Sequence, residues 1–195
     1  LFSITGFDSI SKDIELEMKK KKINYFFSKS KKINTSEKLR IISQNQQLIR
    51  LDFESNYLIE TEKKASKELL SKFKKNLISK KVTAVVLSDY LKGTLINCSD
   101  YINFSKKRNL PVFIDPKGLD FFKYKNATLL YLKKSKYKNA TLLKPNYDEF
   151  LRVVGSVRNN NEFLSKALVL CKQLNLSALL VTKGAEGMTL VLKNG

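Results

Sequence analysis

Four apolar segments of this chain each run into a cluster of polar, turn-forming residues, and this pattern constrains the fold most strongly. Strands are expected at 82–87, 110–114, 142–143 and 178–181, and helical patterns near 97–108, 148–154 and 162–174 alternate with them. Such alternation predicts an α/β fold with a mainly parallel sheet. Segments 84–87 and 178–181 are apolar without interruption, which is typical of strands that are covered on both faces.

The polar clusters predict an anion-binding edge, because parallel strands all end at the same edge of a sheet and open α/β sheets bind ligands there. The clusters are 88–93, 115–118, 144–149 and 182–184. In the third cluster Asn146 and Glu149 are three residues apart, so they lie on one face of a first helical turn. Their oxygen atoms suit a divalent cation that is bound through water.

The remaining segments predict smaller elements around this sheet. Residues 1–4 resemble the end of a strand that turns at Gly6, Asp8 or Ser9 is the expected cap of a helix, and a strand is expected near 23–28. Residues 33–54 interleave apolar and polar side chains, as half-exposed antiparallel strands do, and predict a small separate sheet. Residues 60–79 predict an amphipathic helix, and 178–182 with 188–192 predict a hairpin. The apolar side of that helix consists of Ala65, Leu69, Leu70, Phe73 and Leu77.

The composition excludes several kinds of chemistry. The chain contains no His, which excludes a Ser-His-Asp triad, an imidazole base and most zinc sites. Cys98 and Cys171 are isolated in expected helices, so we interpret them as reduced, packed thiols, consistent with a cytoplasmic location. No apolar run reaches the roughly 18 residues of a membrane helix, so a membrane partner is not expected.

The formal net charge of +19 has two interpretations. Such a charge attracts polyanions, so a basic nucleic-acid-binding protein is an alternative from another functional class. However, the lysines are spread over nearly every segment and accompany many Asn, Ile, Phe, Tyr and Ser residues, as in proteins from AT-rich genomes. We therefore favour codon drift over a selected nucleic-acid surface.

An octamer is repeated within the chain: residues 123–130 recur unchanged as 136–143, with a period of 13 residues. Two copies of one strand-forming segment cannot occupy the same sheet position. We interpret the first copy and its bridge, 131–135, as an insertion without catalytic purpose, although the sequence does not decide which copy enters the sheet.

The order and spacing of these motifs resemble the sugar kinases of the ribokinase family, and within it the heptose 7-phosphate kinases. The resemblance covers essentially the whole chain and rests on Lys38-Leu39-Arg40, the run from Gln46 to Glu54, Leu87-Ser88-Asp89-Tyr90 with Lys92-Gly93, Asp115-Pro116-Lys117-Gly118, Pro145-Asn146 with Glu149-Phe150, and Leu179-Leu180-Val181-Thr182 with Gly187-Met188. It implies a ribokinase-like three-layer sandwich with a mainly parallel central sheet and a small β lid at about 33–54, as one partial kinase domain over 1–195.

The resemblance also implies a reaction, its ligands and a set of site residues. The reaction is transfer of the ATP γ-phosphate to the anomeric hydroxyl of a sugar phosphate, most closely D-glycero-β-D-manno-heptose 7-phosphate, for ADP-heptose and lipopolysaccharide synthesis. Mg²⁺ is held through water by Asn146 and Glu149. The other implied ATP or phosphate ligands are Lys117, Lys144, Tyr147, Asp148, Thr182 and Gly184. The implied sugar-phosphate ligands are Lys38, Arg40, Asp89 and Lys92.

The resemblance implies that both ends of the domain are incomplete. The chain begins at Leu1 rather than Met and ends at Gly195 directly after an apolar strand. A Gly-rich sugar-binding segment is expected before Leu1, and a Gly-Ala-Gly-Asp anion hole with the catalytic base is expected beyond Gly195, so no catalytic base is assigned here. A truncated, inactive remnant of such a kinase is therefore the second alternative. A homodimer through the lid is expected by resemblance.

Overall fold

The structure is a computed structural model that describes residues 1–54, 63–118, 120, 121, 124 and 142–193. The chain forms two compact units, Leu1–Asn76 and Leu77–Gly195. No helix within the described ranges is long and apolar enough to cross a membrane.

The first unit is built around a β-α-β arrangement. Strands β1 (Phe2–Gly6) and β2 (Phe26–Ser30) pair in parallel, and α1 (Ser9–Lys20) connects them. Helix α2 (Lys63–Ser79) packs Ala65 and Leu69 into a small core with Ile4 and Ile33. All five apolar residues on the expected side of this helix are buried, which confirms its amphipathic pattern.

The turn from β1 into α1 depends on Gly6 and Asp8. Asp8 is the N-cap, as one of the two expected candidates, and its Oδ1 accepts a hydrogen bond of 2.8 Å from the Ser11 N–H. Its Oδ2 accepts a second bond of 2.7 Å from the Thr35 N–H. A Cβ atom at position 6 would lie 2.6 Å from the Ile33 carbonyl oxygen, so only glycine fits this close approach.

A two-stranded hairpin in the same unit has one apolar and one charged face. Strands β3 (Glu37–Ser43) and β4 (Gln46–Phe53) are antiparallel, within the range expected for the lid. The register pairs Leu39 with Leu51 and Ile41 with Ile49, and it pairs Lys38 with Asp52 and Arg40 with Arg50. Opposite residues project to the same side, so the first two pairs form the apolar face and the last two pairs form the charged face.

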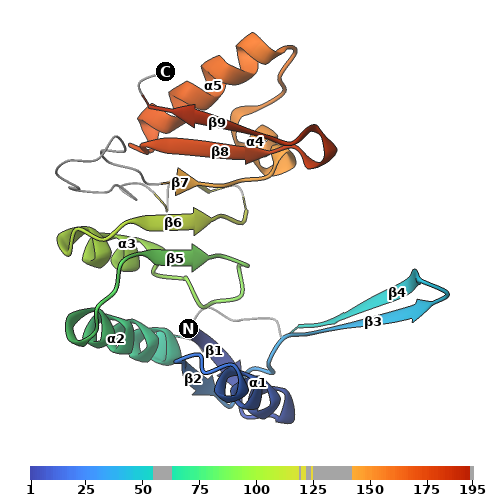
Figure 1. Ribbon diagram of the computed structural model, residues 1–195, viewed down its shortest axis with the longest axis vertical. Helices are drawn as coiled ribbons and strands as arrows, with labels where there is room; N and C mark the ends of the chain where they lie inside the picture. Colours follow the sequence, from blue (N-terminus) through green and yellow to red (C-terminus); the bar gives the residue numbers. More distant parts are fainter. Residues whose placement is uncertain (55–62, 119, 122–123, 125–141, 194–195) are drawn as a thin grey trace. The chain divides into compact units, whose positions relative to one another are not determined.

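The second unit contains a five-stranded sheet in the order β5-β6-β7-β8-β9 (Figure 1). Strands β5 (Val85–Ser88), β6 (Val112–Asp115), β7 (Leu142–Leu143) and β8 (Ala178–Thr182) are parallel, and β9 (Met188–Leu192) is antiparallel to β8, which confirms the expected hairpin. The helices are α3 (Cys98–Lys107), α4 (Tyr147–Val154) and α5 (Asn160–Gln173). Cys98 and Cys171 are buried free thiols, as expected, and burial raises the pKa of Cys171 to about 11.

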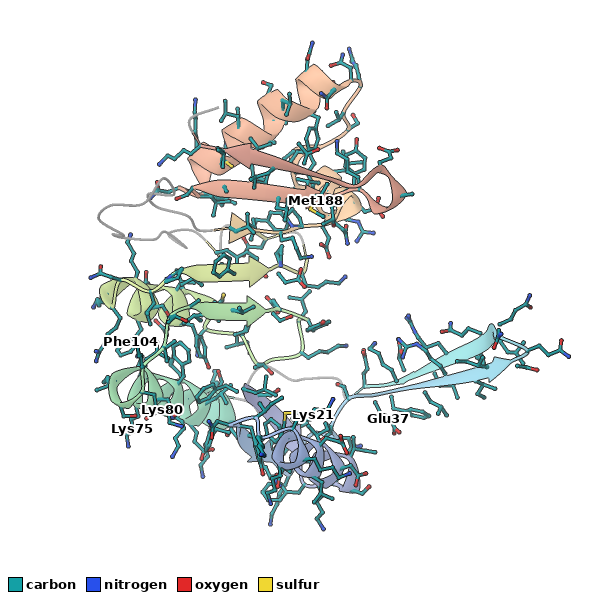
Figure 2. All side chains as sticks on the ribbon, viewed as in Figure 1. Lys21, Glu37, Lys75, Lys80, Phe104 and Met188 are labelled. Atoms are coloured by element: carbon teal, nitrogen blue, oxygen red, sulfur yellow. The ribbon has the colours of Figure 1, made fainter. Side chains whose placement is uncertain are left out.

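The two faces of this sheet differ in burial, and one sequence expectation was wrong here. The register row Leu87, Ile114, Leu143, Leu179 and Val191 is buried in every strand. The adjacent row contains Val86, which is 71% exposed, whereas Leu87 is 4% exposed. Met188, which is labelled in Figure 2, and Leu190 of β9 are also exposed. Within the described residues, strand β5 is therefore covered on one face only. The expectation that its unbroken apolar sequence marks a strand covered on both faces was wrong.

The repeated octamer contributes to the unit from both copies. Leu142 and Leu143 of the second copy form β7, so the second copy holds the sheet position. Tyr124 of the first copy is fully buried. The interpretation of the first copy and its bridge as an insertion without catalytic purpose stays a prediction, because apart from Tyr124 they lie outside the described residues.

We expect deletion of residues 125–137 to leave the fold intact. The deletion joins Tyr124 to Lys138 and regenerates one unbroken octamer, so both the buried tyrosine and β7 are kept. Shortening the connection from about 17 to about 4 residues lowers the entropy cost of loop closure by about 1 kcal/mol. Urea denaturation followed by circular dichroism should show equal or greater stability. Loss of the cooperative transition would contradict this expectation.

Candidate active site

The carboxyl ends of the parallel strands bring oppositely charged side chains together. Asp115 ends β6 and Lys144 follows β7, and the Lys144 Nζ lies 3.0 Å from the Asp115 Oδ1. Asn146 forms a parallel bridge with Thr182 at the end of β8, where the Thr182 N–H donates to the Pro145 carbonyl oxygen at 3.1 Å. The predicted edge therefore exists in this unit, with polar side chains contributed by successive strands.

Asn146 and Glu149 form the N-terminal cap of α4. The Asn146 Oδ1 accepts a hydrogen bond of 2.8 Å from the Glu149 N–H, and the Glu149 Oε2 accepts one of 3.1 Å from the Asn146 N–H. This reciprocal pair is a capping box, which satisfies two backbone donors of the first turn. The Asn-x-x-Glu sequence thus has a structural role as well as the expected metal role.

Glu149 is a buried carboxylate with a cationic partner. It is 7% exposed, and the Lys117 Nζ lies 3.1 Å from its Oε1. A buried charge needs such compensation, and the N-terminus of α4 adds a favourable dipole. The predicted residues Lys117 and Glu149, which are 32 positions apart, are therefore in direct contact.

A second Asn-x-x-Glu cap in the chain lies at another helix. The Asn159 Oδ1 accepts from the Glu162 N–H at 2.9 Å, and the Glu162 Oε2 accepts from the Arg158 N–H at 2.8 Å. The Arg158 N–H is the main cause that lowers the pKa of Glu162, followed by Lys166. This cap shares with the α4 cap the bond from the Glu N–H to the Asn side chain, but the Glu162 carboxylate accepts from the residue before the N-cap instead of from the N-cap itself. Helix α5 also does not follow a strand directly, so its cap lacks the strand-end environment.

Asp89 lies at the end of β5, and its carboxylate is used inside the protein. The side chain is buried at 7% exposure. Its Oδ1 accepts from the Leu91 N–H at 2.8 Å, and its Oδ2 accepts from the Tyr124 hydroxyl at 2.7 Å. The sequence suggested a sugar ligand at this position, but the structure surrounds the carboxylate with protein donors.

Several of the expected nucleotide-side residues lie around α4 and β8. The ring centroid of Tyr147 lies 6.2 Å from that of Phe163, and Asp148 is exposed in the first turn of α4. Gly184 begins a short 3-10 helix, η2 (Gly184–Glu186), with a φ of 60°. Lys92 is half-buried in the turn after β5.

Lys38 and Arg40 belong to the charged face of the β3–β4 hairpin in the first unit. The Lys38 Nζ lies 3.4 Å from both Asp52 and Glu54, and the guanidinium of Arg50 lies 3.1 Å from Asp52. Arg40 is exposed and directly opposite Arg50. The hairpin therefore presents several cations on one face.

The residues at the strand ends fit Mg²⁺ held through water. No group of three or more His, Cys, Asp or Glu side chains lies together among the described residues, so a closed protein cage for a metal is not formed there. Mg²⁺ does not need one, since it keeps several waters and uses substrate phosphates as ligands. Each Glu149 oxygen accepts a hydrogen bond from the protein and retains lone-pair capacity for a metal-bound water.

Asp115 and Tyr124 make contacts at this edge that the sequence did not predict. Asp115 was visible as the first residue of a polar cluster, and its strand-end position was a usable signal for its contact with Lys144. Tyr124 gave no such signal, because its contact with Asp89 joins residues 35 positions apart and its octamer occurs twice.

Comparison with known structures identifies the class of fold. The structure of ribokinase from Giardia lamblia aligns with a TM-score of 0.67 at 15% identity, covering 97% of this chain and 58% of that chain. The structure of phosphofructokinase-2 from Escherichia coli in complex with fructose-6-phosphate aligns with a TM-score of 0.69 at 12% identity, covering 98% of this chain and 59% of that chain. The fold is therefore ribokinase-like, as expected.

Sequence comparison then identifies the family. The model of the pfkB family of carbohydrate kinases matches residues 1–195, and the chain belongs to this family. It is 39% identical over its whole length to the bifunctional protein HldE of Coxiella burnetii, and 44% identical over 160 residues, or 82% of this chain, to an uncharacterized sugar kinase of Buchnera aphidicola. The chain spans 37% of the length of the first relative and 45% of the second.

Proposed function

We propose that this chain is part of an ATP-dependent kinase that phosphorylates the anomeric hydroxyl of D-glycero-β-D-manno-heptose 7-phosphate, in the synthesis of ADP-heptose for lipopolysaccharide. The observation that carries the proposal is the meeting of Lys117, Glu149, Lys144 and Asp115 at the carboxyl ends of adjacent parallel strands. Similarity to HldE proteins over the whole chain supports the choice of sugar.

The proposed division of roles follows from charge and position. Lys117 and Lys144 each have a carboxylate partner in the structure, and both ammonium groups are partly exposed. They can therefore turn toward the phosphates of ATP and stabilise the charge that develops during transfer. Thr182 and Gly184, with Tyr147 and Asp148, form the nucleotide side of the same edge.

Mg²⁺ would be held by Asn146 and Glu149 through its water shell, and it would neutralise charge on the ATP phosphates. The capping box fixes both side chains relative to the start of α4, so their oxygens keep a defined separation. The attacking hydroxyl must lose its proton as the phosphoryl group moves to it and ADP leaves. Among the described residues at this edge, Asp115 is paired with Lys144 and Asp89 is buried, so neither is proposed as the base.

The charged face of the hairpin is the proposed site for the phosphate already present on the sugar. Arg40 is exposed and lies opposite Arg50, which is itself paired with Asp52 at 3.1 Å, and a bound anion would reduce the repulsion between the two like charges. Arginine binds phosphate through two parallel hydrogen bonds. We propose that Lys38 and Arg40 bind this phosphate. In the second unit, Lys92 is the proposed sugar ligand in the turn after β5, whereas the Asp89 carboxylate already accepts two hydrogen bonds from the protein.

The apolar face of the hairpin supports a homodimer. An isolated two-stranded sheet is marginally stable in water, and this one exposes a continuous strip of aliphatic side chains. A second copy offers an identical strip, so two hairpins can bury each other with their charged faces outward. We propose that the protein dimerises in this way.

The intact protein that contains this chain is expected to convert ATP and heptose 7-phosphate to ADP and heptose 1,7-bisphosphate when Mg²⁺ is present. Phosphorus NMR would detect the new anomeric phosphate directly. Fructose 6-phosphate and ribose serve as competing acceptors for specificity. Preference for either acceptor would contradict the proposed sugar, and failure to form ADP with all three would contradict the kinase assignment.

A further inference from the structure

Asp89 and Tyr124 connect two loops of the second unit at the same edge. The Tyr124 hydroxyl donates to the Asp89 Oδ2 at 2.7 Å and accepts from the Lys117 N–H at 3.3 Å. The ring of Tyr124 is fully buried. Burial raises the pKa of Tyr124 well above its usual range, with the Asp89 hydrogen bond as the next cause, so the hydroxyl keeps its proton and remains a donor.

The second connection from Asp89 passes through Leu91. This residue has a φ of 55°, a left-handed conformation that is unfavourable for a bulky side chain, and the Asp89 Oδ1 accepts the hydrogen bond of its N–H. The Leu91 side chain packs over Gly118, since a Cβ atom there would lie 3.1 Å from the Leu91 Cδ1. Gly118 itself has a φ of 90°, which only glycine adopts without strain.

Both connections therefore end on the turn that carries Lys117. The Asp89 carboxylate orients Tyr124, whose hydroxyl binds the Lys117 N–H. The same carboxylate also stabilises Leu91, which contacts Gly118. Lys117 in turn reaches Glu149 at the start of α4. A displacement of this turn would move the ammonium group away from the carboxylate.

We propose that Asp89 and Tyr124 are positioning residues that hold the turn Asp115–Gly118 so that Lys117 faces Glu149. This assigns Asp89 a role behind the ligand site, in place of the sugar contact that the family resemblance implied. The inference about catalytic effect rests on the proposed kinase function, whereas the inference about the turn rests only on the contacts above.

The repeat supplies a matched pair of variants to test the proposal. Tyr124→Phe removes one hydroxyl while keeping the buried ring, and Tyr137→Phe makes the same change in the identical octamer of the second copy. Amide hydrogen exchange measured by NMR should show the Lys117 N–H exchanging about 5- to 10-fold faster in Tyr124→Phe, because a single hydrogen bond is lost. Tyr137→Phe should exchange as the unmodified protein does.

Kinetics of the intact protein provide a separate readout. We expect Tyr124→Phe to lower kcat about 10-fold with little change in melting temperature, which separates misplacement of Lys117 from general destabilisation. Unchanged exchange and kcat in Tyr124→Phe would overturn the proposal, and so would equal effects of the two variants. If the unmodified protein phosphorylates no sugar, the kinase assignment fails, but the exchange rate of the Lys117 amide still decides whether Tyr124 holds the turn.

Discussion

Glu149→Gln is expected to lower kcat of the intact protein by about 10- to 100-fold, the usual cost of losing a residue that orients metal-bound water. Glutamine has the same length and keeps an oxygen that accepts the Asn146 N–H, so the cap of α4 survives. What is lost is the negative charge next to Lys117 and the second acceptor oxygen. The required Mg²⁺ concentration should rise as well, and steady-state assays over a Mg²⁺ series measure both effects.

Glu162→Gln is the matched control for this experiment. Glu162 caps α5 through the same spacing, and it pairs with Lys166 at 3.0 Å as Glu149 pairs with Lys117. Both substitutions should cost about 1 kcal/mol or less in stability, because Lys117 is exposed in one ion pair and both partners of the other are about one third exposed. Only Glu149→Gln should affect catalysis. Equal kcat in the two variants would mean that Asn146 and Glu149 act only as a helix cap.

The two helix caps illustrate how far the sequence predicts the candidate site. Strand-end position favours Asn146 and Glu149 over Asn159 and Glu162 as a ligand site, although the spacing is the same, because ligands of α/β sheets bind where strands end. The contact between Lys117 and Glu149 is consistent with the same reasoning, since adjacent parallel strands end side by side. The orientation of side chains within the edge could not be predicted in this way. Asp89 also follows a strand, but its contacts with the Leu91 N–H and the Tyr124 hydroxyl depend on the folded structure.

Local sequence patterns predicted the positions of helices and strands, but they did not predict which faces of the sheet are buried. Helix and strand positions follow local patterns, and the amphipathic helix and the final hairpin were both confirmed. Whether a strand is buried on both faces depends on which other elements cover the sheet. The sequence of the strand itself does not give this information. Val86 and Leu87 are equally apolar, yet one is exposed and the other buried. The repeat posed the same difficulty, because identical octamers carry no local signal that separates Tyr124 from Tyr137.

Replacing Leu39 and Ile41 together by Lys is expected to convert a dimer into monomers. Leu39 and Ile41 are 44% and 45% exposed within one chain, so their replacement should leave the fold of the chain unchanged. In the proposed dimer the exposed part of each side chain becomes buried, so each of the four side chains, two from each copy, contributes about 0.7 to 1.3 kcal/mol. Their loss corresponds to an increase in Kd of about 100- to 10,000-fold. Sedimentation equilibrium measures the change, with circular dichroism to verify the fold.

Arg50→Gln is the control for this substitution, because Arg50 lies on the opposite face of the same hairpin and projects away from the proposed contact. It should leave the dimer intact while weakening sugar-phosphate binding through the loss of a neighbouring cation. If Arg50→Gln also produced monomers, the two faces would not have separate roles. An unmodified protein that remains monomeric at about 100 μM would exclude the dimer, since an interface that buries such a strip from both copies should bind more tightly than this. The apolar face of the hairpin would then have to be covered by other residues of the intact protein, and the double Lys variant would lower the stability of the monomer instead of changing its association.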